Sequence, residues 1–414
     1  MRPLLLVWML VVHFITLGSA QNLTPSSSWK EPNITSPKDD RISFARSALE
    51  KAVSMLQSNG QFNDSTYETP GRLYAQMAEF DRLTNQTIYK DILKRYFLEA
   101  ESLNPGFLDM TSLSNGLSYG YAAARAYAAY QDPDFLDLAV TSWISARRYT
   151  ISKEQATSGT TGVKQFSLSP SCPNQGPGAT MAGGTFLSND SNDTRVSSRA
   201  SGLSALLAEA TSNQTYLDAA IESATFIQSH LLNPSDVVLN YISSSCVVDQ
   251  GQFPYNCGIF IEGLVILADM THNASTESLL RSTIVAVTSA LKWQGSNGII
   301  NTKTNGGHHV VRALGALYER NTTSSDLREY IKQYIGVQYN AVIKQSTSGS
   351  NIYGIPWTQL SSNTFNSVGQ TVAISALLSS MQLVGGSSDN PTSSAIPSPS
   401  ASMSPLPTKK TPTG

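Results

Sequence analysis

Several features that mark common classes of protein are scarce or missing in this chain. Charged residues make up 14% of its 414 residues, and the formal net charge is −2. Such a balance provides no electrostatic attraction to nucleic acid or to an anionic membrane, so we expect neither as a partner. The sequence also lacks a nucleophile elbow, a phosphate-binding loop and a zinc-ligand spacing, so we expect no cofactor and no metal.

Cysteine is equally scarce. Cys172, Cys246 and Cys257 follow the N-terminal segment. In an oxidising compartment, three cysteines form one bonded pair and leave one thiol. We predict a disulfide between Cys246 and Cys257, which bracket the ten residues VVDQGQFPYN. The pairing of Cys172 with Cys246 is the alternative.

Long apolar runs are missing except at the N-terminus. Arg2 is followed by an apolar run from Leu4 to Ile15 and by the small residues Gly18, Ser19 and Ala20. This pattern predicts a secretory signal peptide over residues 1–20, cut after Ala20, with an uncleaved anchor as the alternative. Because the run is short for a bilayer span, we expect a secreted, extracellular protein with no membrane span after cleavage.

Nine N-x-Ser/Thr sequons follow the signal peptide. In a secreted chain they predict a heavily glycosylated surface, with each site exposed. The sequons begin at Asn22, Asn33, Asn63, Asn85, Asn189, Asn192, Asn213, Asn273 and Asn321.

The two ends of the chain are polar. Residues 21–40 carry prolines and two sequons, and we predict a flexible leader there. Residues 386–414 are rich in Ser, Pro and Thr, which predicts a disordered tail similar to an O-glycosylated stalk. No hydrophobic segment follows that tail, so we expect no lipid anchor signal. Residues 41–385 are then one folded domain, which we expect to be a monomer.

A helical repeat fills this domain. In LSALLAEATSNQTYLDAAIESATFI, from Leu203, and LVILADMTHNASTESLLRSTIVAV, from Leu264, one helix ends at a polar turn and a second begins. Five such hairpins are clear, and helices from Ile42 and Phe365 are placed to pair across the chain ends. We predict an all-α (α/α)6 toroid with short β-ribbons from Val237 and Asn297. An open superhelix is the alternative, but it would need capping repeats.

Long irregular inserts interrupt the repeat at residues 151–195, 235–256 and 345–364. They favour the closed toroid. In such a fold the hairpins are the scaffold, and the inserts and helix N-termini line a cleft.

One segment resembles a known family. FPYNCGIFIEGLVILADMT, residues 253–271, is similar to a segment of glycoside hydrolase family 76, the endo-α-1,6-mannanases. MAGGTF at 181–186 and the WTQ that begins at Trp357 also fall in that family's order, and the similarity is greatest to fungal secreted members. The resemblance implies an (α/α)6 fold and retaining cleavage of α-1,6-mannosidic bonds.

The catalytic residues that this resemblance implies are missing. The family places two adjacent aspartates at the start of one inner helix, and retaining hydrolysis needs two carboxylates roughly 5 Å apart. Here those positions fall on Ser114 and Asn115, in a segment from Ser112 to Ala124 that has no Asp, Glu, His, Lys or Cys. Asp109 is the nearest upstream acid and the candidate catalytic residue, with a loop or helix-cap role as the plain alternative.

Sugar binding needs less than hydrolysis, because aromatic rings and amide or hydroxyl groups suffice. The resemblance implies such roles for Tyr119, Tyr255, Asn256 and Trp357. Tyr119 and Tyr121 lie on opposite helix faces, so at most one of them faces the cleft.

Three further polar residues could have either a functional or a structural role. Glu262 replaces a small residue of the family pattern and is either a buried functional acid or a structural one. His308 and His309 are adjacent and have no further ligand at metal-binding spacing, which favours a helix start over a metal site.

We therefore expect a secreted, cell-wall-associated carbohydrate-active protein of the family 76 type. It acts on or binds α-mannan or mannooligosaccharide, in a wall or on a glycoprotein. The alternatives are a catalytically inactive mannan-binding relative and a structural surface glycoprotein.

Overall fold

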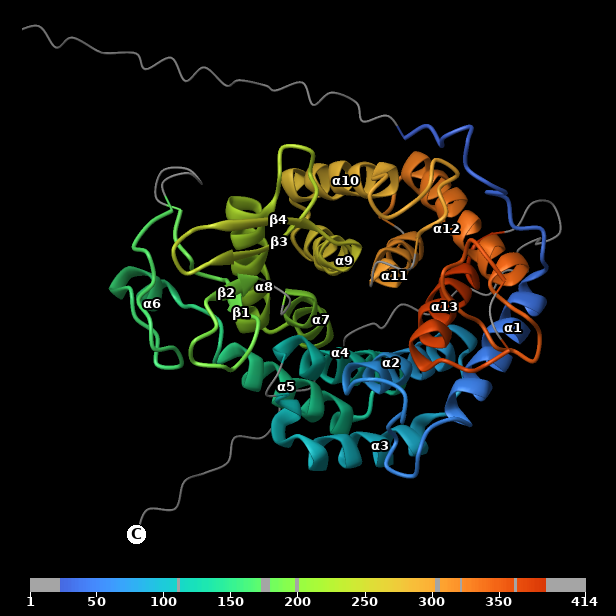
Figure 1. Cartoon of the computed structure of the whole chain (residues 1–414), viewed down its shortest axis with the longest axis horizontal. Coiled ribbons are helices and arrows are strands. Elements are labelled where there is room, and N and C mark those ends of the chain that lie inside the picture. The colour runs from blue at the N-terminus through green and yellow to red at the C-terminus, as the bar shows by residue number, and fades with distance from the viewer. Residues whose placement is uncertain are drawn as a thin grey trace, which may run out of the picture.

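In the computed structural model of the chain, twelve of the described helices alternate between an inner and an outer ring (Figure 1). The structure describes residues 23–109, 112–172, 179–197, 201–301, 306–320, 322–360 and 363–384. The signal peptide over 1–20, the sequons at Asn22 and Asn321 and the tail over 386–414 lie outside these residues.

The inner ring is closed. Each inner helix packs on the next, and the last packs on the first, so the helices from the two ends of the chain meet. The inner helices are α2 (Glu68–Thr84), α4 (Leu113–Tyr130), α7 (Ser201–Thr211), α9 (Pro254–Thr271), α11 (Gly307–Tyr318) and α13 (Ser367–Ser380). This closure confirms the predicted (α/α)6 toroid.

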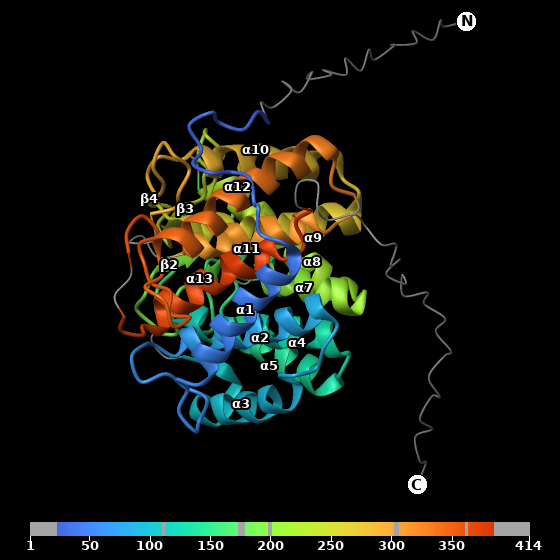
Figure 2. The ribbon, with the colours of Figure 1, turned by 90° about the vertical axis from the view of Figure 1, so that its right-hand side faces the viewer.

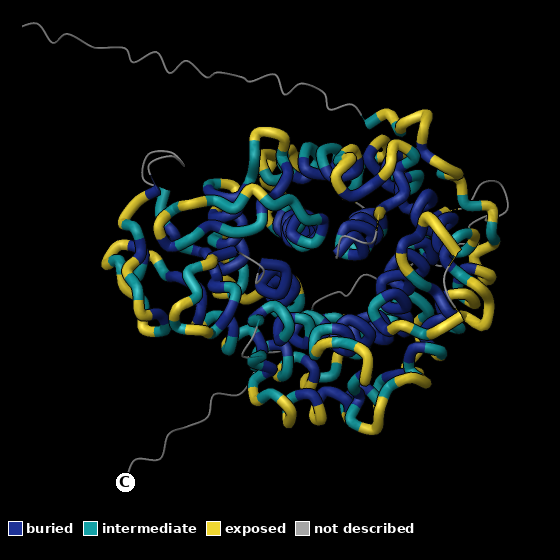
Figure 3. Tube along the Cα trace, in the orientation of Figure 1, coloured by how far each residue is buried: buried dark blue, intermediate teal, exposed yellow. Residues whose placement is uncertain are grey.

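The outer helices cover the inner ring from outside. They are α1 (Lys38–Val53), α3 (Lys90–Leu103), α5 (Pro133–Arg147), α8 (Gln214–Phe226), α10 (Ala274–Ser289) and α12 (Ser325–Gln345). Figure 3 shows the consequence: the inner ring is mostly buried, and exposed residues gather on the perimeter. Opening helix α1 packs on closing helix α13, as the sequence predicts.

Polar caps begin the outer helices after the turns. Asp132, ahead of Pro133, accepts a hydrogen bond from the backbone N–H of Asp134 at the start of α5. Asn213 and Asn273 cap α8 and α10 in the same way. Such caps satisfy backbone donors that have no partner within the helix.

Glycines let the inner helices approach closely at two places beside the cleft. A Cβ at Gly71 of α2 would lie 2.4 Å from the Ser118 hydroxyl of α4, and a Cβ at Gly258 of α9 would lie 2.4 Å from the His309 carbonyl carbon of α11. A side chain at either position would force a helix pair apart.

The first two inserts and the residues next to them form one small antiparallel sheet. Strands β1 (Thr185–Phe186), β2 (Arg195–Ser197), β3 (Leu239–Ser243) and β4 (Val248–Gln252) pair in chain order, beside the short helix α6 (Lys153–Ser158). Seen from the side, strands β2–β4 gather at one end of the helix layers (Figure 2). The ribbon predicted from Val237 is thus confirmed as β3. The segment from Asn297 makes a single bridge, between Gln294 and Ile300.

Two further short elements sit at helix ends. A 3-10 turn (Pro105–Phe107) precedes α4, and a π-helical turn (Ile227–Leu231) continues α8.

The predicted flexible leader is wrong for residues 23–40. Trp29 is buried, with its ring centroid 5.3 Å from those of Tyr330 and Tyr334 on α12. The Asn340 side chain donates hydrogen bonds to the backbone carbonyls of Glu31 and Asn33. Helix α1 then begins at Lys38, three residues before the predicted domain start. Composition alone missed this arm because one tryptophan anchors an otherwise polar segment.

The predicted disulfide is also wrong. Cys172 pairs with Cys246, with a Cα–Cα distance of 5.5 Å, and this was the alternative pairing. Cys246 lies in the turn between β3 and β4. Cys257 faces the core from the first turn of α9, where its sulfur is 3.4 Å from the Val238 backbone nitrogen. Burial raises the pKa of this free thiol to about 12.

Candidate functional site

A cavity of about 290 Å³ lies where five inner helices begin. Helices α2, α4, α7, α9 and α11 all contribute their N-terminal residues to it, as expected for a cleft built from helix starts. The lining residues are Glu68, Arg72, Ser112, Ser114, Asn115, Leu117, Ser118, Tyr121, Gly202, Leu203, Tyr255, Ile259, Glu262, Gly306, His309 and Arg312.

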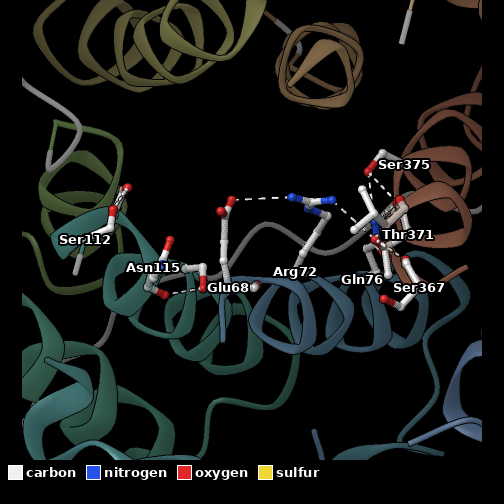
Figure 4. A network of polar contacts seen from close by, with 11 residues as sticks. Glu68, Arg72, Gln76, Ser112, Asn115, Ser367, Thr371 and Ser375 are labelled. Carbon is white, nitrogen blue, oxygen red and sulfur yellow. Dashed lines mark hydrogen bonds and ion pairs between the residues drawn. The ribbon is translucent and has the colours of Figure 1, made fainter. Parts of the chain in front are cut away.

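Ser114 and Asn115 face this cavity from the first turn of α4. The Ser112 and Ser114 hydroxyls are 2.7 Å apart, and the Asn115 amide donates a hydrogen bond of 2.7 Å to the Asp109 carboxylate. Figure 4 shows Ser112 and Asn115 on the same side of the central space as Glu68 and Arg72 of α2. The helix start thus presents hydroxyl and amide groups where the resemblance places two carboxylates.

Asp109 accepts a hydrogen bond from the Asn115 side chain and lies outside the cavity lining. It is half-buried and is not among the described residues that line the cavity. Its carboxylate accepts from Asn115, so the arrangement fits the plain alternative of a loop residue that positions its neighbour.

Two carboxylates line the described part of the cavity, and they differ in how firmly they are held. Glu262 of α9 is buried, and its two oxygens accept three hydrogen bonds from Tyr121 and Arg312. Glu68 of α2 is 29% exposed and meets Arg72 at a long 3.4 Å. Glu68 is therefore the carboxylate that is more available to a ligand.

The floor of the cavity is an ionic and aromatic layer. The Tyr121 hydroxyl donates to Glu262 at 2.6 Å, and the Arg312 guanidinium donates to the other oxygen at 2.7 Å. The same guanidinium carbon lies 4.0 Å from the Tyr121 ring centroid, in a cation–π contact. Each charged group in this layer thus has a partner, as burial of charge requires.

Arg72 completes the floor on the α2 side. It reaches Thr371 of α13 at 3.3 Å and Glu68 at 3.4 Å (Figure 4). Burial lowers the pKa of Arg72, and the Glu68 carboxylate opposes that change. Gln76, one turn further along α2, also bonds to Thr371 and to Ser375, so this side of the floor is fastened to α13.

A second ion network lies deeper along the axis of the toroid. Glu79 accepts from Arg82 and Arg125, and Arg82 also reaches Glu319 at 2.6 Å. Burial alone would raise the pKa of Glu79, but the two arginines hold it well below its usual range. This network lies in the ring beneath the floor, where Glu79, Arg125 and Glu319 line a second, smaller pocket.

Tyr255 lines the cavity as a fixed ring. Its hydroxyl bonds to the Asn240 side chain of β3 at 2.9 Å, and its ring stacks on Phe253 with centroids 5.7 Å apart. Asn256, the neighbouring prediction, is buried, and its amide donates to the backbone carbonyl of Leu239. Asn256 therefore fastens α9 to β3.

The other two predicted sugar-binding residues are core residues, which corrects those assignments. Tyr119 is fully buried and stacks on Phe107, with ring centroids 5.5 Å apart. Trp357 is also fully buried. Tyr121, two residues after Tyr119, lines the cavity instead, in agreement with the expectation that at most one of the two tyrosines faces it.

His308 and His309 begin α11, as the alternative to a metal site predicts. Their rings lie 4.1 Å apart, and burial lowers the pKa of His308 well below its usual value, with Arg72, His309 and Arg312 acting in the same direction. In the described part of the chain, no group of three His, Cys, Asp or Glu side chains is arranged to hold a metal ion.

The described sequons agree in part with the predicted exposure. Asn189 is half-buried. The exposed ones are Asn33, Asn63, Asn85, Asn192, Asn213 and Asn273. Within the described ranges, every helix is too short or too polar to cross a bilayer.

Sequence reasoning missed Glu68, Arg72 and Arg312 as site residues. Each of the two arginines has a partner that is distant in the chain: Arg312 pairs with Glu262, and Arg72 reaches Thr371. Spacing patterns cannot reveal contacts of this kind. A usable signal was present for Arg312 and Glu262, since each is a charged residue flanked by apolar or small residues within an inner helix.

Solved structures show the same fold. The chain matches an inactive variant of the α-1,6-mannanase GH76A of Salegentibacter sp. HEL1_6, in which two consecutive aspartates are replaced by alanine, in complex with α-1,6-mannotetrose. Identity is 15% over 83% of this chain and 100% of that chain, with a TM-score of 0.69.

Two further structures agree. Dfg5 from Chaetomium thermophilum, in complex with glucosamine, is 14% identical over 84% of this chain and 91% of that one, with a TM-score of 0.64. A family 76 α-mannanase from Bacteroides thetaiotaomicron is 15% identical over 84% and 96% of the two chains, with a TM-score of 0.61. No curated protein matched the sequence significantly.

The sequence itself matches a family description. The model of glycosyl hydrolase family 76 aligns with residues 186–394, which is half of the chain. That range begins at β1 and includes Tyr255, Glu262 and Arg312 of the cavity. On this match and the toroid with its cavity at the inner helix starts, the chain belongs to glycosyl hydrolase family 76.

Proposed function

We propose that the cavity binds α-1,6-linked mannooligosaccharides and does not cleave them by the two-carboxylate mechanism of the family. The observation that carries this proposal is the pair Ser114 and Asn115 at the start of α4. Neither side chain can act as a proton donor and a carboxylate nucleophile in retaining hydrolysis. The family fold and a cavity of about 290 Å³ remain available for binding.

The lining fits a neutral sugar. Tyr255 offers a fixed ring, Asn115 and the serine hydroxyls offer hydrogen bonds, and Glu68 offers a carboxylate acceptor. The paired charges of Glu262 and Arg312 offset each other. Such a mixture of one aromatic face and several polar groups is typical of carbohydrate sites.

The proposal also concerns where the protein is found: outside the cell. The N-terminal signal pattern and the disulfide between Cys172 and Cys246 both fit an oxidising, extracellular environment. We infer a fungal secreted glycoprotein that binds mannan in the cell wall. A purely structural surface glycoprotein is the alternative, and it would need no ligand in the cavity.

The test combines binding and product release on the secreted protein. Calorimetry with α-1,6-mannotetraose is expected to show binding, and mass spectrometry of the same mixture is expected to show an intact sugar. Tyr255→Ala should weaken binding about tenfold through loss of the aromatic face. Tyr255→Phe is the matched control, because it keeps the ring and removes the hydroxyl that bonds to Asn240.

A hydrolase with relocated acids is the second candidate, and Glu68 favours it. This carboxylate is partly exposed in the cavity, whereas both Glu262 oxygens are occupied. Release of shorter sugars that is lost in Glu68→Gln would establish this candidate and overturn the binding-only proposal. Release that is lost in Asp109→Asn would instead implicate the upstream acid. If neither binding nor release is found, the mannan assignment is wrong.

A further inference from the structure

The six inner helices contain nine glycines, and packing accounts for most of them. A fold requires glycine where the backbone has a positive φ or where a neighbouring atom leaves no room for a Cβ. All nine have the ordinary negative φ of a helix. At seven of them a Cβ would lie only 1.7–3.2 Å from a neighbouring heavy atom, so another side chain would force the structure to shift. These seven are Gly71, Gly116, Gly120, Gly258, Gly307, Gly315 and Gly369.

Gly202 of α7 and Gly263 of α9 are the two exceptions. For a Cβ at Gly202, the nearest described atom is the Cγ2 of Ile259, at 3.6 Å. For a Cβ at Gly263, it is the backbone carbonyl carbon of Ser201, at 4.0 Å. Both distances are ordinary van der Waals contacts, and alanine is a better helix former than glycine. The fold therefore has room for alanine at both positions.

The two positions differ in their relation to the cavity. Both lie where α7 and α9 pack on each other in the inner ring (Figure 1). Gly202 lines the cavity, whereas Gly263 is not among the described lining residues. Ile259, which a Cβ at Gly202 would contact, also lines it. A side chain at Gly202 would therefore take up space beside the cavity wall, and a glycine keeps that space open to a ligand.

The wall around Gly202 suits one face of a sugar ring. A pyranose ring carries C–H groups on its faces and hydroxyls at its edges, so a face packs well on a smooth apolar surface. Leu203 and Ile259 provide apolar surface next to Gly202 in the cavity lining. Gly202 itself lies in the first turn of α7, where the absence of a side chain lets a ring approach the helix backbone.

We propose that Gly202 is a ligand contact of the cavity: a mannosyl ring lies against the backbone of the first turn of α7, in the space that a larger side chain would occupy. This inference rests on the proposed mannan binding and adds the wall on which a sugar ring packs. A methyl group at this position displaces the ring from the wall, and overfilling a fitted contact is costly.

Gly202→Ala and Gly263→Ala form a matched pair that tests the inference. Calorimetry measures the Kd for α-1,6-mannotetraose, and urea unfolding of the same samples measures stability. Gly202→Ala should raise the Kd by about tenfold or more, because the methyl group occupies the place of the ring. Its urea midpoint should be at or above that of wild type, because alanine fits the fold. Gly263→Ala should show the same stability and a Kd within about twofold of wild type.

Gly202→Ser separates lost room from altered polarity. Serine is close to alanine in size and adds a hydroxyl that can bond to a sugar. If room decides, the Kd of Gly202→Ser should rise as it does in Gly202→Ala. A wild-type Kd in Gly202→Ser would mean that a side chain fits beside the ligand, and it would overturn the inference.

The remaining outcomes are distinguishable. Binding by Gly202→Ala as tight as by wild type overturns the inference and leaves the proposed mannan binding in place. A lower urea midpoint for Gly202→Ala shows that the fold itself requires the glycine, which overturns the inference as well. Equal weakening in Gly202→Ala and Gly263→Ala places the effect in the contact between α7 and α9 and has the same consequence. Absence of binding by wild type contradicts the proposed function, and the inference falls with it.

Discussion

Replacing Arg312 with methionine tests the floor of the cavity most sharply. Arg312 provides two of the three hydrogen bonds to Glu262, whose side chain is 3% exposed. Methionine fills much of the same space but carries no charge. The substitution therefore leaves the Glu262 carboxylate buried, with the Tyr121 hydroxyl as its remaining donor in the described contacts.

The expected loss follows from burial. Breaking a buried ion pair by removing one partner costs about 3–5 kcal/mol. Arg312 is 22% exposed, so some water reaches the pair, and we expect about 3 kcal/mol, the lower end of that range. For a domain of this size such a loss lowers the Tm by roughly 4 °C.

The assay is calorimetric unfolding of wild type, Arg312→Met, Glu262→Met and the double variant. Replacing both partners with apolar residues of similar volume is often neutral, so the double variant should lie within about 1 kcal/mol of wild type. A single variant as stable as wild type, or a double variant with additive losses, would refute the view that this pair is a tightly coupled buried unit.

Three further predictions concern the rest of the fold. Burial holds the pKa of His308 below its usual 6.5. Below pH 6.5 the unfolded chain therefore binds a proton at this residue that the folded chain does not. The free energy of unfolding should fall as the pH drops below 6.5. Melting curves across this range should show a smaller fall for His308→Gln, whereas His272→Asn, at an exposed turn, should match wild type. Non-reducing peptide maps should join Cys172 to Cys246, and reduction should cost about 2–5 kcal/mol because the bond closes a separation of 74 residues. In unglycosylated protein, urea unfolding of Asn213→Ala should show a loss of about 1 kcal/mol through its missing cap, whereas Asn213→Asp should keep that cap.

The toroid was predictable because each of its helices is marked by residues close together in the sequence. Apolar residues at helical spacing, polar turns and an N-cap such as Asp132 repeat along the chain, and each hairpin has one way to bury its face. The position of the cavity followed from the same pattern, since inner helices that alternate with outer ones all begin at the same end. The absence of carboxylates at Ser114 and Asn115 was likewise visible in the sequence.

The cavity floor was not predictable, because its contacts join residues that are far apart in the chain. Tyr121 meets Glu262 across a separation of 141 residues, and Arg72 meets Thr371 across 299. Tyr119 and Tyr121 differ only in which side of α4 they occupy, and the rotation of that helix is set by packing against Phe107.

The disulfide failed as a prediction for a related reason. Short separation favours Cys246 with Cys257, but Cys257 belongs to the buried start of α9, and the fold brings Cys172 next to the turn that carries Cys246. Chain separation is a weak guide to pairing once a packed domain fixes which side chains face each other.

A crystal structure with α-1,6-mannotetraose tests the central claim most directly. We predict an intact tetrasaccharide bound in the cavity, against Tyr255 and beside Ser114 and Asn115. A cleaved product in the cavity, or a sugar bound elsewhere on the protein, would contradict the account.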